Sequence, residues 1–259
     1  MSPTPPERVP RRVTRLLARL HAHRAPFLFI HAPMRSGTTL LQHILAQEPE
    51  FLTAGETHVV YRSPRDLRRL LERVYAYHGW LGVRPRCVVE KCVTDDLVED
   101  CSLPAWPRVQ SVFLVREPLD TIASLLALRD RPWPFTESVE TAAAYYLARL
   151  VQLERLAESV PARARGFVLT YAELVERPEQ ALGALSRFLE LGRPLRSEYR
   201  EQRWTGEARR GDLSPTIRQG TIVRRESPAR LDIPPPLRER LVAAHDAALA
   251  RLRRRCDGT

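Results

Sequence analysis

The residues with the clearest capacity for chemistry lie between an apolar run, residues 27–30, and a helical pattern, residues 38–45. The apolar run predicts a buried strand, and residues 31–37 carry the proline, serine and glycine of a tight loop. Backbone N–H groups of such a loop converge with the positive end of the helix dipole, which favours an anion. Arg35 adds a guanidinium whose fork geometry suits phosphate or sulfate. The sequence therefore predicts an anion-binding loop here.

This loop is not the standard loop of nucleoside triphosphatases, which needs Gly, four residues and then Gly-Lys-Ser/Thr. The leading glycine is missing, and Thr38 stands where the lysine would be. An ATP-dependent small-molecule kinase remains an alternative, and it would need Mg²⁺. A second alternative is an ordinary strand-loop-helix connection with no ligand.

The bulk composition narrows the class of protein. Hydrophobic residues make up 44% and charged residues 28%, which is typical of a globular protein. No apolar run is long enough to cross a bilayer, and residues 1–10 lack the apolar core of a signal peptide. We expect a cytoplasmic protein with no membrane partner. The net charge of +10 comes from arginines spread along the chain, so we expect no nucleic-acid partner. A non-catalytic protein that binds nucleotide or nucleic acid stays an alternative.

One basic residue differs from all the others. Lys91 is the only lysine among 41 basic residues, and an ammonium can donate a proton where a guanidinium stays charged. The other interpretation is that Lys91 is a surface residue that is a lysine only by chance. The four cysteines lack the paired spacing of a zinc site, so we expect no metal.

Strand and helix patterns alternate along the chain. Strand patterns occupy residues 27–30, 86–91, 109–115 and 166–170; helical patterns occupy residues 9–21, 38–45, 63–74, 119–128, 137–160, 179–191 and 237–254. The alternation predicts one α/β domain, residues 1–259, with a central parallel sheet flanked by helices. Residues 1–25 form an N-terminal extension and helix, and residues 234–256 a C-terminal helix. Ligands of such sheets bind beyond the carboxyl ends of the strands.

Two further groups of polar residues occupy positions that could serve such a site. Arg116 directly follows a strand pattern, and Ser124 stands two helical turns later, so both can face one anion. Glu56 and His58 lie in the irregular stretch after the first loop and helix, where a carboxylate can accept a proton. An ion pair with one of the many arginines explains Glu56 as well.

Residues 33–39, Pro-Met-Arg-Ser-Gly-Thr-Thr, closely resemble the 5′-phosphosulfate loop of sulfotransferases that use 3′-phosphoadenosine 5′-phosphosulfate (PAPS). The resemblance extends over roughly residues 27–225. It implies a P-loop-like loop in which Arg35, Ser36, Gly37, Thr38 and Thr39 bind the cosubstrate. It also implies that Arg116 and Ser124, which have the family's spacing, hold the 3′-phosphate.

Within the family, the motifs are most similar to those of tyrosylprotein sulfotransferases and their bacterial relatives. In these enzymes Gly-Glu follows the first helix and the glutamate is the base, which implies that role for Glu56. A lysine at the end of the second strand contacts the transferring group, which implies that role for Lys91. Cytosolic sulfotransferases use a histidine as base, so His58 stays open as a rival. Arg35 is implied to stabilise charge beside the leaving group.

Two later segments match the family less closely. Tyr171, in Leu-Thr-Tyr-Ala-Glu-Leu, is implied to approach the nucleotide, although a position in the core explains it nearly as well. Gly220 and Arg224 resemble the late loop that covers the 3′-phosphate, but this loop lacks the family's usual tryptophan.

The resemblance implies in-line transfer of a sulfuryl group from PAPS to a hydroxyl, leaving 3′-phosphoadenosine 5′-phosphate (PAP), without a metal. Because we find no secretory signal, we expect a small-molecule acceptor, such as a natural product, rather than a protein tyrosine. Trp133, Phe135, Tyr61 and His78 are candidates to line the acceptor pocket, although core packing explains aromatic residues equally well.

Overall fold

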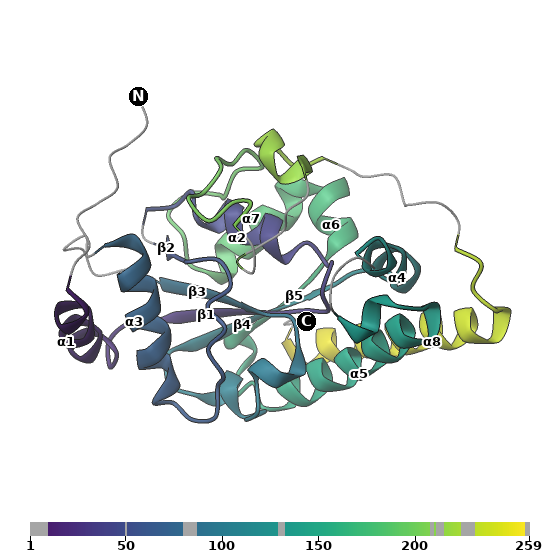
Figure 1. Ribbon diagram of the computed structural model, residues 1–259, viewed down its shortest axis with the longest axis horizontal. Helices are drawn as coiled ribbons and strands as arrows, with labels where there is room; N and C mark the ends of the chain where they lie inside the picture. The colour runs from purple at the N-terminus through teal and green to yellow at the C-terminus, as the bar shows by residue number, and fades with distance from the viewer. Residues whose placement is uncertain are drawn as a thin grey trace.

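The computed structural model describes residues 10–49, 51–79, 87–128, 133–207, 210, 215–223 and 231–256. Its centre is one five-stranded sheet in which all the paired strands are parallel (Figure 1). The spatial order of the strands is β2 (Phe51–Leu52), β3 (Cys87–Cys92), β1 (Phe27–His31), β4 (Val109–Val115) and β5 (Gly166–Thr170). Helices lie above and below this sheet. The predicted α/β class with a central parallel sheet is confirmed.

Strand β2 is the element that the sequence did not predict. It lies in the stretch expected to be irregular, and it pairs through Phe51 with Cys87 and through Leu52 with Val88. Two residues are too few to show a strand periodicity, so only the pairing with β3 identifies this strand. The pairing matters because it positions the start of the segment that carries Glu56.

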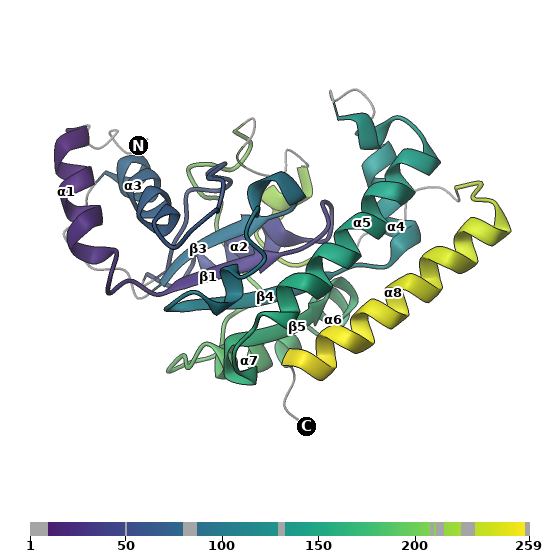
Figure 2. The same ribbon diagram turned by 90° about the horizontal axis from the view of Figure 1, so that it is seen from below.

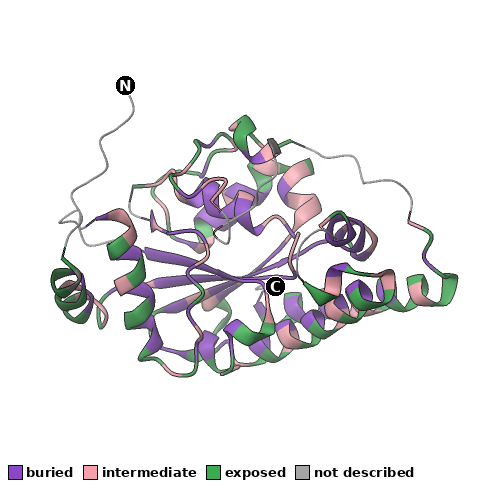
Figure 3. Ribbon diagram, viewed as in Figure 1, coloured by how far each residue is buried: buried purple, intermediate pink, exposed green. Residues whose placement is uncertain are grey.

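The two faces of the sheet are covered by different helices, and the alternation along β1 shows how. Phe27 and Phe29 pack into one core, whereas Leu28 and Ile30 pack into another, as expected for a strand buried on both faces. The strands are buried along most of their length (Figure 3). The first core is covered by α1 (Arg11–His21), α3 (Asp66–His78), α4 (Pro118–Leu126), α5 (Val139–Glu158) and α8 (Pro235–Cys256). The second is covered by α2 (Thr38–Leu45), α6 (Tyr171–Glu176) and α7 (Pro178–Phe188). Among the described helices, none is long and apolar enough to cross a membrane.

Helix α5 holds the strand ends at the edge of the sheet where ligands are expected. Arg149, fully buried, donates from Nη2 to the carbonyl oxygens of Ala32 (3.1 Å) and Cys92 (3.0 Å), which follow β1 and end β3. Its Nη1 pairs with the carboxylate of Asp95. Burying a guanidinium is costly unless its donors are used, so this side chain fixes the two strand ends relative to each other.

The two tyrosines before Arg149 act on neighbouring backbone groups. The hydroxyl of Tyr145 accepts the backbone N–H of Met34 (2.8 Å) and donates to the carbonyl of Val93 (2.6 Å). The hydroxyl of Tyr146 donates to the carbonyl of Arg116 (2.8 Å). One helix therefore braces the segments that follow β1, β3 and β4. Helix α5 lies below the sheet in Figure 1 and crosses in front of the strands in Figure 2, which is seen from below.

We predict that Arg149→Leu destabilises the fold by about 2–5 kcal/mol, because it removes the Arg149 hydrogen bond from two buried carbonyl oxygens. Of these two, only the carbonyl of Cys92 keeps another donor within the described part of the chain, the N–H of Ala32. Urea unfolding followed by circular dichroism measures the change. Arg155→Leu is the matched control, since Arg155 lies on the same helix and is exposed. A loss below about 1 kcal/mol for Arg149→Leu, equal to that of the control, would contradict this role.

Candidate active site

The loop between β1 and α2 has the backbone shape of an anion cradle. Arg35 and Gly37 both adopt positive φ, 70° and 89°, and Gly37 precedes α2 in a left-handed conformation. A Cβ added at Gly37 would lie 2.7 Å from Cδ2 of Tyr171, so glycine is required for the conformation and for the close approach of this ring. Ser36 is fully buried in the loop, and its hydroxyl has no hydrogen-bond partner among the described residues. A buried hydroxyl without a partner is the expected sign of a site for a polar ligand.

At this loop the structure gathers five of the predicted residues: Arg35 and Gly37 of the loop itself, and Arg116, Ser124 and Tyr171 from later in the chain. The Nε of Arg35 donates to the hydroxyl of Ser124 (2.9 Å), and Nη1 of Arg116 donates to the carbonyl of Arg35 (3.1 Å). The guanidinium of Arg116 also lies over the ring of Tyr171, 4.4 Å from its centroid. Two arginines and a hydroxyl therefore come together from three segments of the chain. We call Arg35, Arg116 and Ser124 the Arg116 group.

Where α2 begins, directly after the loop, Glu56, Lys91 and Thr39 lie together. The Nζ of Lys91 is 3.1 Å from Oε1 of Glu56 and donates to the hydroxyl of Thr39 (2.7 Å). Lys91 is buried, with 2% of its side chain exposed, whereas 22% of the Glu56 side chain is exposed. His58 approaches the same carboxylate, with Nε2 at 3.8 Å from Oε2. We call these three and His58 the Glu56 group; it contains both candidate bases and the only lysine of the chain.

Several side chains hold the segment around Glu56 in place. Gln42 donates to the hydroxyl of Thr53 (2.5 Å) and to the carbonyl of Gly55 (3.2 Å), and His78 lies 2.7 Å from the carbonyl of Thr53. The backbone N–H of Glu56 donates to the carbonyl of Arg210 (2.8 Å). Arg73 donates to the carbonyl of Thr57. The carboxylate of Glu56 is therefore presented by a braced backbone.

Glu90 is a neighbour that the sequence analysis did not single out. It lies beside Lys91 on β3, is fully buried, and its Oε1 accepts the backbone N–H of Thr57 (3.1 Å). Burial raises the pKa of Glu90 to about 8, and the charge of Glu56 adds to the rise, whereas the hydrogen bonds from Thr57 oppose it. The sequence could have identified Glu90 by its position within an apolar strand pattern, because a carboxylate in a buried strand needs a partner.

The remaining predicted residues are placed less closely. Gly220, with φ of 72°, pairs through its carbonyl with the N–H of Tyr199 (2.8 Å), whose ring lies edge-on to His43 of α2. Its described contacts are with this segment and not with the Arg116 group. Arg224 lies outside the described residues. Thr38 is buried at the start of α2. Because the side chain of Arg35 contacts Ser124, its role beside the leaving group stays a prediction.

The aromatic residues predicted to line an acceptor pocket have varied positions. Tyr61 is fully buried and packs edge-on against Phe29, so core packing explains it. Trp133 and Phe135 are stacked, with ring centroids 6.0 Å apart, and Phe135 stacks on Tyr145. Through Tyr145 this stack reaches the loop backbone at Met34.

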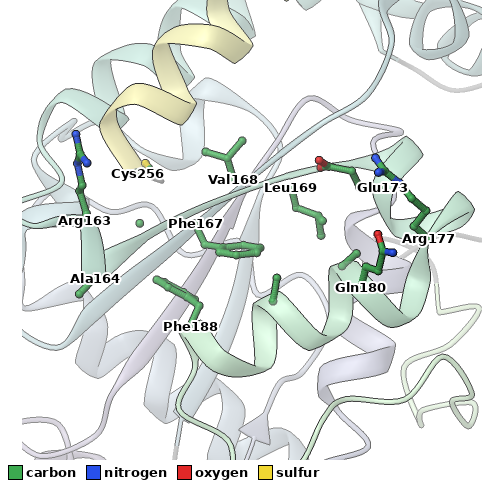
Figure 4. Close-up of a pocket in the computed structure, with 13 residues that line it drawn as sticks. Arg163, Ala164, Phe167, Val168, Leu169, Glu173, Arg177, Gln180, Phe188 and Cys256 are labelled. Atoms are coloured by element: carbon green, nitrogen blue, oxygen red, sulfur yellow. The ribbon is translucent and has the colours of Figure 1, made fainter. Parts of the chain in front are cut away.

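A separate recess of about 610 Å³ lies along β5, between α7 and the end of α8 (Figure 4). Its walls include Phe167, Phe188, Arg177 and Cys256, and none of the predicted site residues lines it. Among the described residues, no group of three or more His, Cys, Asp or Glu side chains is arranged to hold a metal ion. The metal-free reaction stays a prediction.

No protein-family model matches the chain, and no curated protein sequence does. Among solved structures, the sulfotransferase domain from the curacin biosynthetic pathway is similar, with a TM-score of 0.56 and 17% identity over 85% of this chain and 96% of that one. A sulfotransferase from Alicyclobacillus acidocaldarius aligns with a TM-score of 0.49 and 18% identity over 88% and 94% of the two chains. A mouse sulfotransferase complexed with PAP aligns with a TM-score of 0.45 and 14% identity over 67% of this chain and 63% of that one. The chain therefore has the sulfotransferase fold, and the resemblance seen in the motifs is confirmed at the level of the fold.

We predict that Glu90→Gln makes stability less dependent on pH. In the unfolded chain this carboxyl has its ordinary pKa of 4.5, whereas burial in the folded protein raises the pKa to about 8. The contribution of this group to stability is therefore fully present below the pKa of the unfolded chain and is lost as the pH rises through the pKa of the folded protein. The free energy of unfolding, measured with urea between about pH 5 and about pH 8.5, falls less for Glu90→Gln than for the wild type.

Glu99→Gln serves as the control, because that carboxylate is half-exposed and pairs with Arg62 at the surface. Equal pH slopes for Glu90→Gln and the wild type would show that Glu90 does not hold its proton in the folded protein.

Proposed function

We propose that this chain is a sulfotransferase that moves the sulfuryl group from PAPS to a hydroxyl of a small-molecule acceptor, such as a natural product. The observation that carries the proposal is that two groups of side chains meet at one loop and at the start of the helix that follows it. The Arg116 group offers cations and a hydroxyl, and the Glu56 group offers a carboxylate and an ammonium. The Thr38 and Thr39 backbone joins the two at the start of α2.

The loop residues fit the phosphosulfate end of this cosubstrate. The buried hydroxyl of Ser36 lacks a partner among the described residues, and a phosphate oxygen is a suitable one. The left-handed Gly37 precedes α2, so the first N–H groups of that helix and its dipole favour an anion beside the loop. When bound, PAPS would supply the sulfuryl group and a phosphate as leaving group.

The Arg116 group suits a second phosphate. Arg116 is 7% exposed and is oriented by the ring of Tyr171 and by the carbonyl of Arg35, which fixes its fork before a ligand arrives. Ser124 supplies a hydroxyl at 2.9 Å from Arg35. A nucleotide with phosphates at both its 3′ and 5′ positions can engage this group and the loop together, which AMP and ATP cannot.

In the transfer, the chain's own groups would do three things. Glu56 would accept the proton of the acceptor hydroxyl, since it is partly exposed and its backbone is braced. Lys91 would stabilise negative charge as it develops on the bridging oxygen, because its ammonium lies between Glu56 and Thr39. The loop would hold the reacting groups in line, which is the larger part of such catalysis.

We expect Glu56→Gln to lower the transfer rate about 10²–10⁴-fold while PAP binding is kept, because a general base is lost. The measurement is transfer of labelled sulfur from PAPS to a panel of phenols and aliphatic alcohols. Glu154→Gln is a matched control, since Glu154 is 21% exposed against 22% for Glu56 and also takes part in an ion pair. Full turnover of Glu56→Gln at saturating acceptor, with loss of turnover in His58→Gln, would move the base to His58.

A further inference from the structure

A recess of about 640 Å³ opens between α1, α3 and the segment that follows Glu56. Figures 1 and 2 both show α1 beside α3. None of the four residues predicted to line an acceptor pocket belongs to its walls. Instead, polar side chains dominate the lining, namely Arg15, Arg62, Arg69, Arg73, Glu72 and His58.

The charges of this recess are only partly balanced. Arg62 pairs with Glu99 (2.6 Å) and Arg69 with Asp66 (2.9 Å). Glu72, the acidic residue of the lining, faces Arg68 at 3.5 Å. Arg15 and Arg73 have no carboxylate partner among the described residues, so an excess of positive charge stays in the recess.

Arg73 is held in a defined orientation. Its Nη1 donates to the carbonyl of Thr57, which ties the guanidinium to the segment between Glu56 and His58. A cation fixed in this way needs little reorganisation to bind an anion. Arg15 of α1 lines the same recess.

The recess borders the candidate base. His58 belongs to its wall, and Nε2 of the same ring is 3.8 Å from Oε2 of Glu56. The left-handed backbone at His58, with φ of 53°, turns the chain between the two. A molecule seated in the recess therefore lies against the group that contacts the Glu56 carboxylate.

We propose that this recess binds an anionic group of the acceptor, a carboxylate or a phosphate, and so directs the acceptor hydroxyl toward Glu56. The inference rests on the proposed function for the identity of the hydroxyl, and on the charges of the recess for the anion. Arg15 and Arg73 bind the anion, and the surrounding ion pairs leave their charge available.

The first experiment needs no catalysis. Calorimetric titration with phenyl phosphate and with phenylacetate gives dissociation constants for the wild type, Arg15→Gln and Arg73→Gln. Both probes carry an anionic group but no hydroxyl that could accept a sulfuryl group. We expect each variant to bind at least one probe about tenfold more weakly, as for loss of a charge-assisted hydrogen bond. Arg73→Lys keeps the charge and restores most of the binding. Arg19→Gln, an exposed arginine one turn along α1, leaves it unchanged.

The second experiment compares acceptors. With PAPS present, 4-hydroxyphenylacetate and 4-hydroxyphenyl phosphate should show a lower KM than the neutral 4-methylphenol, and Arg15→Gln should raise KM for the anionic acceptors alone. The acceptor with the larger change identifies carboxylate or phosphate as the preferred group.

The outcomes separate the two proposals. Probe binding that is lost in the arginine variants, together with no transfer to any acceptor, would overturn the sulfotransferase proposal and keep the anion site. Probe binding that is absent, or equal in the wild type, Arg15→Gln and Arg73→Gln, would overturn the anion site even if transfer to neutral phenols is rapid.

Discussion

The ion pair between Lys91 and Glu56 is the interaction on which the rest of the site depends. The side chain of Lys91 is only 2% exposed, and a buried charge is tolerated only with a partner and hydrogen bonds. Glu56 supplies the partner and Thr39 the hydrogen bond, so strand β3, the start of α2 and the segment after β2 are joined at Nζ of Lys91. The distance between the anion loop and the candidate base is therefore set by a constraint that is costly to break.

A second layer of polar contacts keeps this geometry fixed. Arg149, Tyr145 and Tyr146 of α5 use their polar groups on backbone atoms that follow the central strands. Buried Glu90 holds the backbone of Thr57 beneath the Glu56 group. The candidate anion loop and the segment that carries the candidate base thus rest on side chains from two different elements, and preorganised sites of this kind lose little entropy when a ligand binds.

Local patterns in the sequence predict the parts of this arrangement that are local. The helix predicted at residues 38–45 is α2, because apolar spacing and the preceding glycine act within a few residues. The loop motif and the spacing of Arg116 and Ser124 predict residues that the fold brings together. The function of Arg149 and of Glu90 depends on partners far along the chain, which no pattern within one helix or strand reveals. The charged lining of the recess likewise arises from packing α1 against α3.

The most direct test of the central claim is calorimetric titration of the protein with PAP, AMP and ATP. The account predicts that PAP binds at least about tenfold more tightly than AMP, because only PAP can place phosphates at both the loop and the Arg116 group. Ser124→Ala should reduce this preference without weakening AMP. Equal and weak binding of all three nucleotides would contradict the account.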